Sequence, residues 1–152
     1  MVSPRSEPMV TLIGFTVNRR KKSLENKKIL NNEEIEICQY LGEGFLPVTS
    51  FGAWRVAMLG YAHRYTKEGM YRIERHTETD EVFVLLEGEA ELCIAGEGKT
   101  PNELKWVPME KNMVYNVKKD VWHHISLKEG SHVLIVENID TGTDNTEYYN
   151  LK

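Results

Sequence analysis

Short runs of alternating hydrophobic and polar residues occupy most of the chain after residue 32, and polar turns separate them. Alternation with a period of two is typical of β-strands that bury one face. The pattern predicts strands at residues 33–40, 53–61, 71–76, 82–86, 90–95, 104–108, 113–117, 122–127 and 133–137. Residues 45–51 are irregular around Pro47, the tail from residue 138 is polar and turn-rich, and the best helix candidate, residues 23–31, is short. We therefore expect an all-β fold of two packed antiparallel sheets.

The strand predicted at residues 53–61 is apolar on both faces. Val56 and Met58 project to one side, whereas Leu59 projects to the other. A core between two sheets covers one of these faces, so the other needs a second cover. We predict a homodimer in which part of residues 1–40 crosses to the partner subunit.

The polar turn at residues 77–80 carries the most distinctive chemistry. His76 ends the strand before the turn, and Glu81 begins the strand after it. A hairpin would make these two residues neighbours, and Glu74 shares a face with His76 because side chains alternate along a strand. An imidazole beside carboxylates is a candidate metal or acid–base site. The structural alternatives are a hydrogen-bonded histidine at a strand end and a simple salt bridge.

The spacing around this turn resembles the first motif of the cupin family. That motif has a glycine, then two histidines that flank one residue, a glutamate three or four residues later, and a second glycine six residues beyond. His76, Glu81 and Gly88 match its spacing, Glu74 stands in place of the first histidine, and the early glycine is displaced to Gly69. The resemblance to small bacterial single-domain cupins implies a double-stranded jelly roll.

The segment that ends at His123 resembles the second cupin motif, which is Pro-any-Gly, two residues, then histidine. Lys118 stands in place of the proline and Asp120 in place of the glycine. His123 then takes the position of the last ligand, and its neighbour His124 points to the opposite face. A histidine among aromatic residues in a strand can also be merely packed. The resemblance covers residues 50–140.

The resemblance implies one divalent cation, manganese, iron, nickel or zinc, held by His76, Glu81 and His123. Glu74 either supplies a fourth ligand or points outward and pairs with a neighbouring arginine. Without metal, the two carboxylates would repel each other, so replacing Glu81 by glutamine is expected to leave the protein as stable or more stable. Three further residues are expected to line the pocket: Trp54, Arg72 and Tyr115.

By this resemblance, we expect chemistry of isomerase, lyase or oxygenase type on a small polar metabolite. One alternative is a non-catalytic module that binds a small ligand without metal. Another is an interaction protein whose basic N-terminal segment engages an acidic partner. The sequence leaves open whether the chain is an enzyme, because one fold hosts many chemistries.

Charge divides the 152-residue chain into two parts. Residues 1–32 hold seven lysines and arginines against two acidic residues, a net of +5, whereas the remainder holds twelve against twenty-one, a net of −9. An acidic body disfavours nucleic acid, and no apolar run approaches the ~18 residues of a membrane span. Basic residues follow the apolar run 9–17, contrary to the order of a secretory signal. We expect a cytoplasmic protein without nucleic-acid or membrane partners. We also expect a basic extension at 1–32 and one cupin domain at 33–152. Within the extension, residues 11–17 are expected to add a strand to a sheet edge.

Overall fold

The computed structural model describes residues 27–151, which form strands and one turn of 3-10 helix. The strands are β1 (Lys27–Asn31), β2 (Glu36–Gln39), β3 (Gly44–Phe51), β4 (Trp54–Gly60), β5 (Arg72–His76), β6 (Glu81–Glu87), β7 (Ala90–Ile94), β8 (Lys105–Pro108), β9 (Val114–Val117), β10 (His123–Leu127), β11 (His132–Asn138) and β12 (Thr146–Asn150), and the 3-10 turn is η1 (His63–Tyr65). Among these residues, no helix is long and apolar enough to cross a membrane. The strand expected at 11–17 lies outside the described residues.

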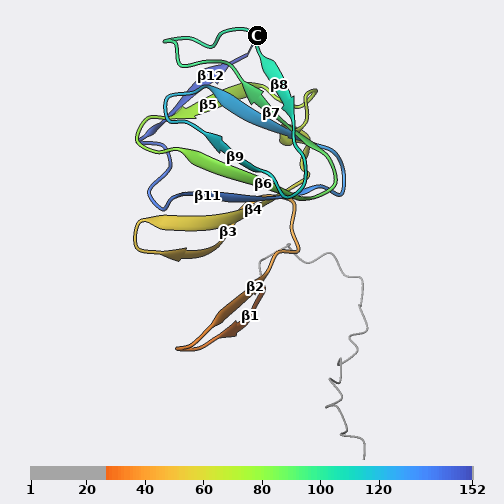
Figure 1. Ribbon diagram of the computed structural model, residues 1–152, viewed down its shortest axis with the longest axis vertical. Coiled ribbons are helices and arrows are strands. Elements are labelled where there is room, and N and C mark those ends of the chain that lie inside the picture. The colour runs from red at the N-terminus through yellow and green to blue at the C-terminus, as the bar shows by residue number, and fades with distance from the viewer. Residues whose placement is uncertain (1–26, 152) are drawn as a thin grey trace, which may run out of the picture.

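Two five-stranded antiparallel sheets pack face to face (Figure 1). Sheet I has the strand order β12-β5-β10-β7-β8, and sheet II has the order β3-β4-β11-β6-β9. From β4 to β7, and again from β8 to β12, successive strands lie in opposite sheets. The all-β fold and the double-stranded jelly roll expected from the sequence are therefore confirmed.

The hairpin predicted at residues 77–80 is wrong. β5 pairs with β10 and β12 in sheet I, whereas β6 pairs with β9 and β11 in sheet II. The turn at residues 77–80 is thus a corner that carries the chain between sheets, and so is the turn before β7. Turn residues mark where the chain reverses, but they do not determine which strand becomes the hydrogen-bonded neighbour.

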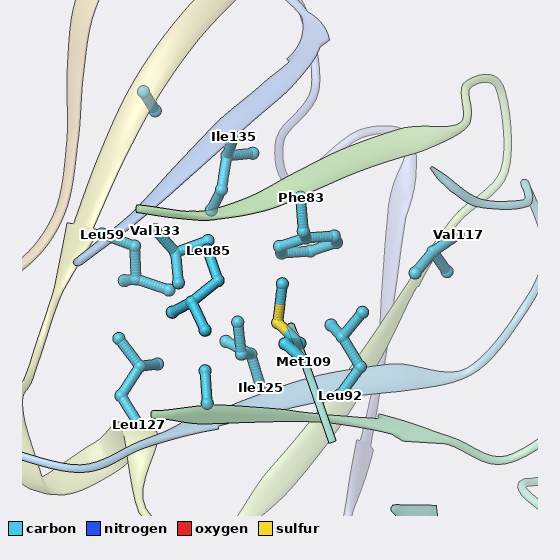
Figure 2. Packing of buried hydrophobic residues seen from close by; sticks show 12 residues of the cluster. Leu59, Phe83, Leu85, Leu92, Met109, Val117, Ile125, Leu127, Val133 and Ile135 are labelled. Carbon is cyan, nitrogen blue, oxygen red and sulfur yellow. The ribbon is translucent and has the colours of Figure 1, made fainter. Parts of the chain in front are cut away.

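The core lies between the inward faces of the sheets. Phe83 and Leu85 of sheet II meet Leu92 and Ile125 of sheet I, and all four are at most 4% exposed (Figure 2). Burial of each such side chain contributes about 1.5–3 kcal/mol. The same alternation that builds this core places charged side chains further along the inner faces of the strands.

Three strands were missed in the sequence. β1 covers Lys27–Asn31 of the segment that was the best helix candidate, residues 23–31, so that candidate is wrong for these residues. Pro47 suggested an irregular segment, but β3 is an edge strand and its register shifts between Pro47 and Thr49, which is where a proline is tolerated. The polar tail forms β12, which pairs along β5 with Thr146 opposite His76. An edge strand of this kind has no apolar alternation to reveal it.

The β1–β2 hairpin projects from the body on the side of β3 (Figure 1). Its turn is closed by Asn32, whose side-chain oxygen accepts hydrogen bonds from two backbone N–H groups. The boundary expected between residues 32 and 33 falls within this hairpin. The hairpin exposes four aliphatic side chains: Ile29, Leu30, Ile35 and Ile37.

Candidate functional site

A cavity of about 260 Å³ opens between the sheets at one end of the core. Its wall changes from apolar to charged along the inner faces of two strands. On β6, Glu81 lies two residues before the apolar Phe83, and on β11, Glu137 lies two residues after the apolar Ile135. All four side chains are buried, so the carboxylates need partners within the protein.

The corner at residues 77–80 brings His76 to Glu81 across the two sheets. His76 Nε2 lies 3.1 Å from Glu81 Oε2, although the residues belong to different sheets. The corner is fixed by its own hydrogen bonds, because Asp80 accepts from the backbone N–H of Lys119 and the backbone N–H of Asp120 donates to the carbonyl of His76. A connection this short keeps its ends close whether or not it forms a hairpin.

His123 joins the same carboxylate from β10. Its Nε2 lies 2.9 Å from Glu81 Oε2, and its Nδ1 donates to the carbonyl of Val121 at 2.8 Å. His76 is held similarly, with Nδ1 at 2.9 Å from the hydroxyl of Thr146. We call His76, Glu81 and His123 the His–Glu–His cluster.

Opposite effects act on the pKa values of the cluster. Burial would raise the pKa of Glu81, but the hydrogen bonds from His123 and His76 outweigh burial and lower that pKa to about 2. Burial would lower the pKa of His123, but the hydrogen bond and the charge of Glu81 outweigh it, so the pKa is raised. In the absence of metal, the cluster therefore favours a carboxylate that faces a protonated ring.

Glu137 is a residue of the cavity that the sequence analysis missed. Arg55 Nε donates to its Oε1 at 3.0 Å, and the same guanidinium donates to the carbonyl oxygens of Ile139 and Thr141. Burial raises the pKa of Glu137 to about 7, and the charge of Glu81 adds to the rise, which Arg55 opposes. The alternation that buries Val133 and Ile135 would have placed Glu137 inward.

Glu74 and Thr141 line the cavity with polar atoms that carry few partners. Burial raises the pKa of Glu74, against the charge of His123, which faces Glu74 across the sheet. The hydroxyl of Thr141 is buried and has no hydrogen-bond partner among residues 27–151. A carboxyl group and a hydroxyl in such positions are suited to meet a polar ligand.

Only one of the three residues expected to line the pocket does so. Arg72 lines the cavity, whereas Trp54 and Tyr115 lie outside it, which corrects their assignment to the pocket wall. Trp54 is on the outer face of β4 because its neighbour Arg55 points inward. Tyr115 packs on the core from edge strand β9, and its hydroxyl accepts a hydrogen bond from the N–H of Glu110.

His124 occupies the opposite face of β10 from His123. Its ring stacks on Tyr65 with centroids 6.0 Å apart, and its Nε2 donates to the carbonyl of Arg64. Burial lowers the pKa of His124 to about 4, so the ring is neutral at physiological pH. His124 borders the outer part of the cavity but takes no part in the His–Glu–His cluster.

The residues of the cluster fit a divalent cation. Ligand atoms about 2.1 Å from one ion and at right angles stand about 3.0 Å apart, close to the 2.9 and 3.1 Å separations in the cluster. The outer nitrogens are already anchored by Val121 and Thr146, as in metal-binding histidines. Two overlapping sets have ligand atoms within 4.8 Å of one another: Glu74, His76 and His123, and His76, Glu81 and Glu137.

Replacing Glu137 by glutamine is expected to flatten the dependence of stability on pH. The folded pKa of Glu137, about 7, lies above its ordinary 4.5, so its contribution to stability is full below pH 4.5 and is lost as pH rises through 7. Allowing for solvent in the cavity, we expect the loss to be on the order of 2 kcal/mol. Urea unfolding of metal-free protein between pH 4.5 and 8 measures it, and an equal slope in both proteins would contradict the assignment.

Comparisons with known proteins bear on the fold. No family model matches the chain, and neither does any curated protein. Among solved structures, Streptomyces Pac13, described as a unique nucleoside dehydratase, matches with a TM-score of 0.52 at 9% identity over 88% of this chain and 93% of that chain. The chain has the cupin fold.

Two other cupin-fold structures are similar to this chain. The QdtA 3,4-ketoisomerase of Thermoanaerobacterium thermosaccharolyticum, in complex with TDP, has a TM-score of 0.49 at 15% identity and covers 82% of this chain and 83% of its own. A cupin-2 domain protein of Shewanella frigidimarina has a TM-score of 0.47 at 17% identity, with 64% and 84% covered. At these identities the likeness concerns the fold, so the chemistry has to come from the cavity.

Proposed function

We propose that this cupin-fold chain is an enzyme that acts on a small polar metabolite, and that His76, Glu81 and His123 hold one divalent cation in the cavity. The observation that carries the proposal is the convergence of two anchored imidazoles on one buried carboxylate. Glu74 has a ligand atom within 4.8 Å of those of His76 and His123, and Glu137 has one within 4.8 Å of those of His76 and Glu81. Pac13, which shares the fold and is known with bound uridine, supports a small polar ligand.

Isomerase or lyase chemistry suits the residues around the cluster best. Oxygenase chemistry is the third reaction type considered. When bound, the cation would act as a Lewis acid toward a substrate oxygen. Where Glu74 is not a metal ligand, its carboxyl group on the cavity wall is the candidate general acid, and burial raises its pKa in the direction that this role needs. Phe83, Ile125 and Ile135 form the apolar floor that limits water at this position.

A second candidate, a site that binds a small ligand without metal, is favoured by one observation. Both nitrogens of His123 face oxygen acceptors, the carbonyl of Val121 and the carboxylate of Glu81. That arrangement suits a protonated ring, which has no lone pair for a metal. Such a site would bind a polar ligand, or transfer protons, through the same cluster.

Thermal melts with and without divalent metal distinguish the two candidates. The enzyme proposal expects Mn²⁺, Fe²⁺, Ni²⁺ or Zn²⁺ to raise the melting temperature, because a ligand that binds only the folded state stabilises it. At one hundred times Kd the gain is about 2.7 kcal/mol, or roughly 5–10 °C. If none of the four metals raises it, the metal-free candidate stands.

We also propose a homodimer formed through the outer face of sheet II. Half-exposed apolar residues form two rows on this face, Val56–Val136–Val82 and Met58–Leu134–Val84, in register across three strands. Strands that are apolar on both faces are typical of sheets covered on both sides. The β1–β2 hairpin presents a second apolar surface, so a second copy of the chain offers a cover for both.

Replacing Leu134 by glutamate is expected to convert the dimer to monomer, because it places a charge at the centre of the apolar rows. Light scattering at micromolar concentration measures the mass. The control is Val107→Glu on β8 of sheet I, which is also exposed and should leave the dimer intact. Deleting residues 1–32 should weaken the dimer, and a monomeric wild type would contradict the proposal.

A further inference from the structure

Two of the four arginines in the described residues carry no ion pair there. Arg55 and Arg75 each pair with a glutamate. The guanidinium groups of Arg64 and Arg72 have no carboxylate oxygen within 4.0 Å among residues 27–151. Neither guanidinium is therefore in a direct ion pair within this part of the chain, although the charge of Arg72 acts on nearby Glu74 and opposes the rise in its pKa.

Aromatic rings position both guanidinium groups. Arg64 lies over Tyr65, 4.6 Å from the ring centroid, and Arg72 lies over Tyr148 at 4.0 Å. A cation–π contact orients a guanidinium without cancelling its charge. The N–H donors lie in the guanidinium plane, where a planar or tetrahedral oxyanion accepts two of them at once.

Both arginines border the space next to the His–Glu–His cluster. They line the main cavity and also a side cavity of about 70 Å³ between η1 and β5. Arg64 is exposed and Arg72 is half-buried, which places them at the opening. Glu74 lies in the same wall without forming an ion pair with either.

Resting on the proposed function, we propose that Arg64 and Arg72 bind an oxyanion of the substrate, a carboxylate or a phosphate. The remainder of the substrate then extends from this side cavity toward His76 and His123. A side cavity of 70 Å³ suits one compact group, whereas drug-sized ligands occupy about 300 Å³ or more. The substrate class is thus a small metabolite with one terminal anionic group.

Calorimetric titration of the full chain with inorganic phosphate, and separately with acetate, tests this inference. We expect saturable binding of at least one anion, and the tighter of the two identifies the group. Arg64→Gln and Arg72→Gln should each weaken that binding about tenfold or more, because a charge-assisted hydrogen-bond pair is lost. Both substitutions lie at the opening, and circular dichroism checks that the variants are folded.

Lys67→Gln is the matched control, since it removes one positive charge three residues from Arg64. Lys67 pairs with Glu91 and lies over Trp106, outside the cavity, so its loss should change the affinity less than twofold. The inference is overturned if neither anion binds saturably, if the arginine variants bind as wild type does, or if the control weakens binding equally.

Metal content measured on the same samples separates the two proposals. Anion binding that depends on the arginines in a protein that takes up no metal overturns the metal site and leaves this inference standing. Metal uptake together with anion binding that ignores the arginines overturns this inference and leaves the metal site standing.

Discussion

Alanine at any one residue of the His–Glu–His cluster is expected to abolish the stabilisation of the protein by divalent metal. His76 Nε2 and His123 Nε2 each lie about 3 Å from Glu81 Oε2, so each substitution would remove a ligand atom from the proposed ion. Loss of an outer hydrogen bond to a metal ligand already costs 10–100-fold in metal affinity, so loss of a ligand should cost more than about 100-fold. The gain of roughly 5–10 °C expected for wild type at saturating metal would then disappear.

His124→Ala is the control for this series. It removes an imidazole from the adjacent position on β10, but His124 stacks on Tyr65 and takes no part in the cluster. Its metal-induced rise in melting temperature should match that of wild type. Equal loss in His124→Ala and His123→Ala would show that the metal binds elsewhere.

Glu81→Ala is expected to destabilise the metal-free protein by about 3–5 kcal/mol, because it leaves two buried histidines without their carboxylate. The lowered pKa of Glu81, about 2 against an ordinary 4.5, gives the pH window. Its contribution to stability is present above pH 4.5 and is lost as pH falls through 2. Urea unfolding at pH 7 and pH 3 measures both effects.

This expectation reverses the one drawn from the sequence for neutralising Glu81. Two carboxylates close together suggested repulsion that a neutral residue would relieve, but the hydrogen bonds from His76 and His123 favour the charged form. Glu81→Gln should therefore also lower the stability of the metal-free protein, though less than alanine, since an amide oxygen in the place of Oε2 still accepts hydrogen bonds from both rings but carries no negative charge.

Asp80 provides a matched control, because its pKa is also lowered to about 2, chiefly by hydrogen bonds from Lys118 and Lys119. Its carboxylate lies at the surface, where salt screens such pairs. Asp80→Asn should cost far less than Glu81→Ala, and its effect should shrink in 1 M salt while that of Glu81→Ala persists. If Glu81→Ala lowered the free energy of unfolding no more than Asp80→Asn does, the buried cluster would not stabilise the fold.

Local spacing and alternation predicted much of the fold from the sequence. A short polar turn brings His76 to Glu81 whether it closes a hairpin or crosses between sheets, so the contact was predicted although the strand pairing was not. Alternation likewise separated His123 from His124, with the choice between them supplied by the cupin resemblance. These features depend only on residues near one another in the chain.

Long-range pairing could not be predicted in this way. β12 is a polar edge strand, so its sequence did not indicate that it pairs with β5. This pairing brings the hydroxyl of Thr146 to Nδ1 of His76. Glu137 was missed for a different reason. Its strand was predicted, but the inward face of that strand was not extended from Ile135 to the glutamate at the strand's end. Its partner Arg55 is 82 residues away in the sequence. The roles of the cluster as a metal site, the homodimer and the cytoplasmic location stay predictions.

Elemental analysis of the purified full-length protein tests the central claim most directly. The protein is measured as isolated and again after stripping and reloading with manganese, iron, nickel or zinc, with His123→Ala alongside. We predict about one equivalent of one of these metals per chain in wild type and a large loss in His123→Ala. Absence of metal from wild type after reloading, or equal metal in the variant, would contradict a divalent cation at His76, Glu81 and His123.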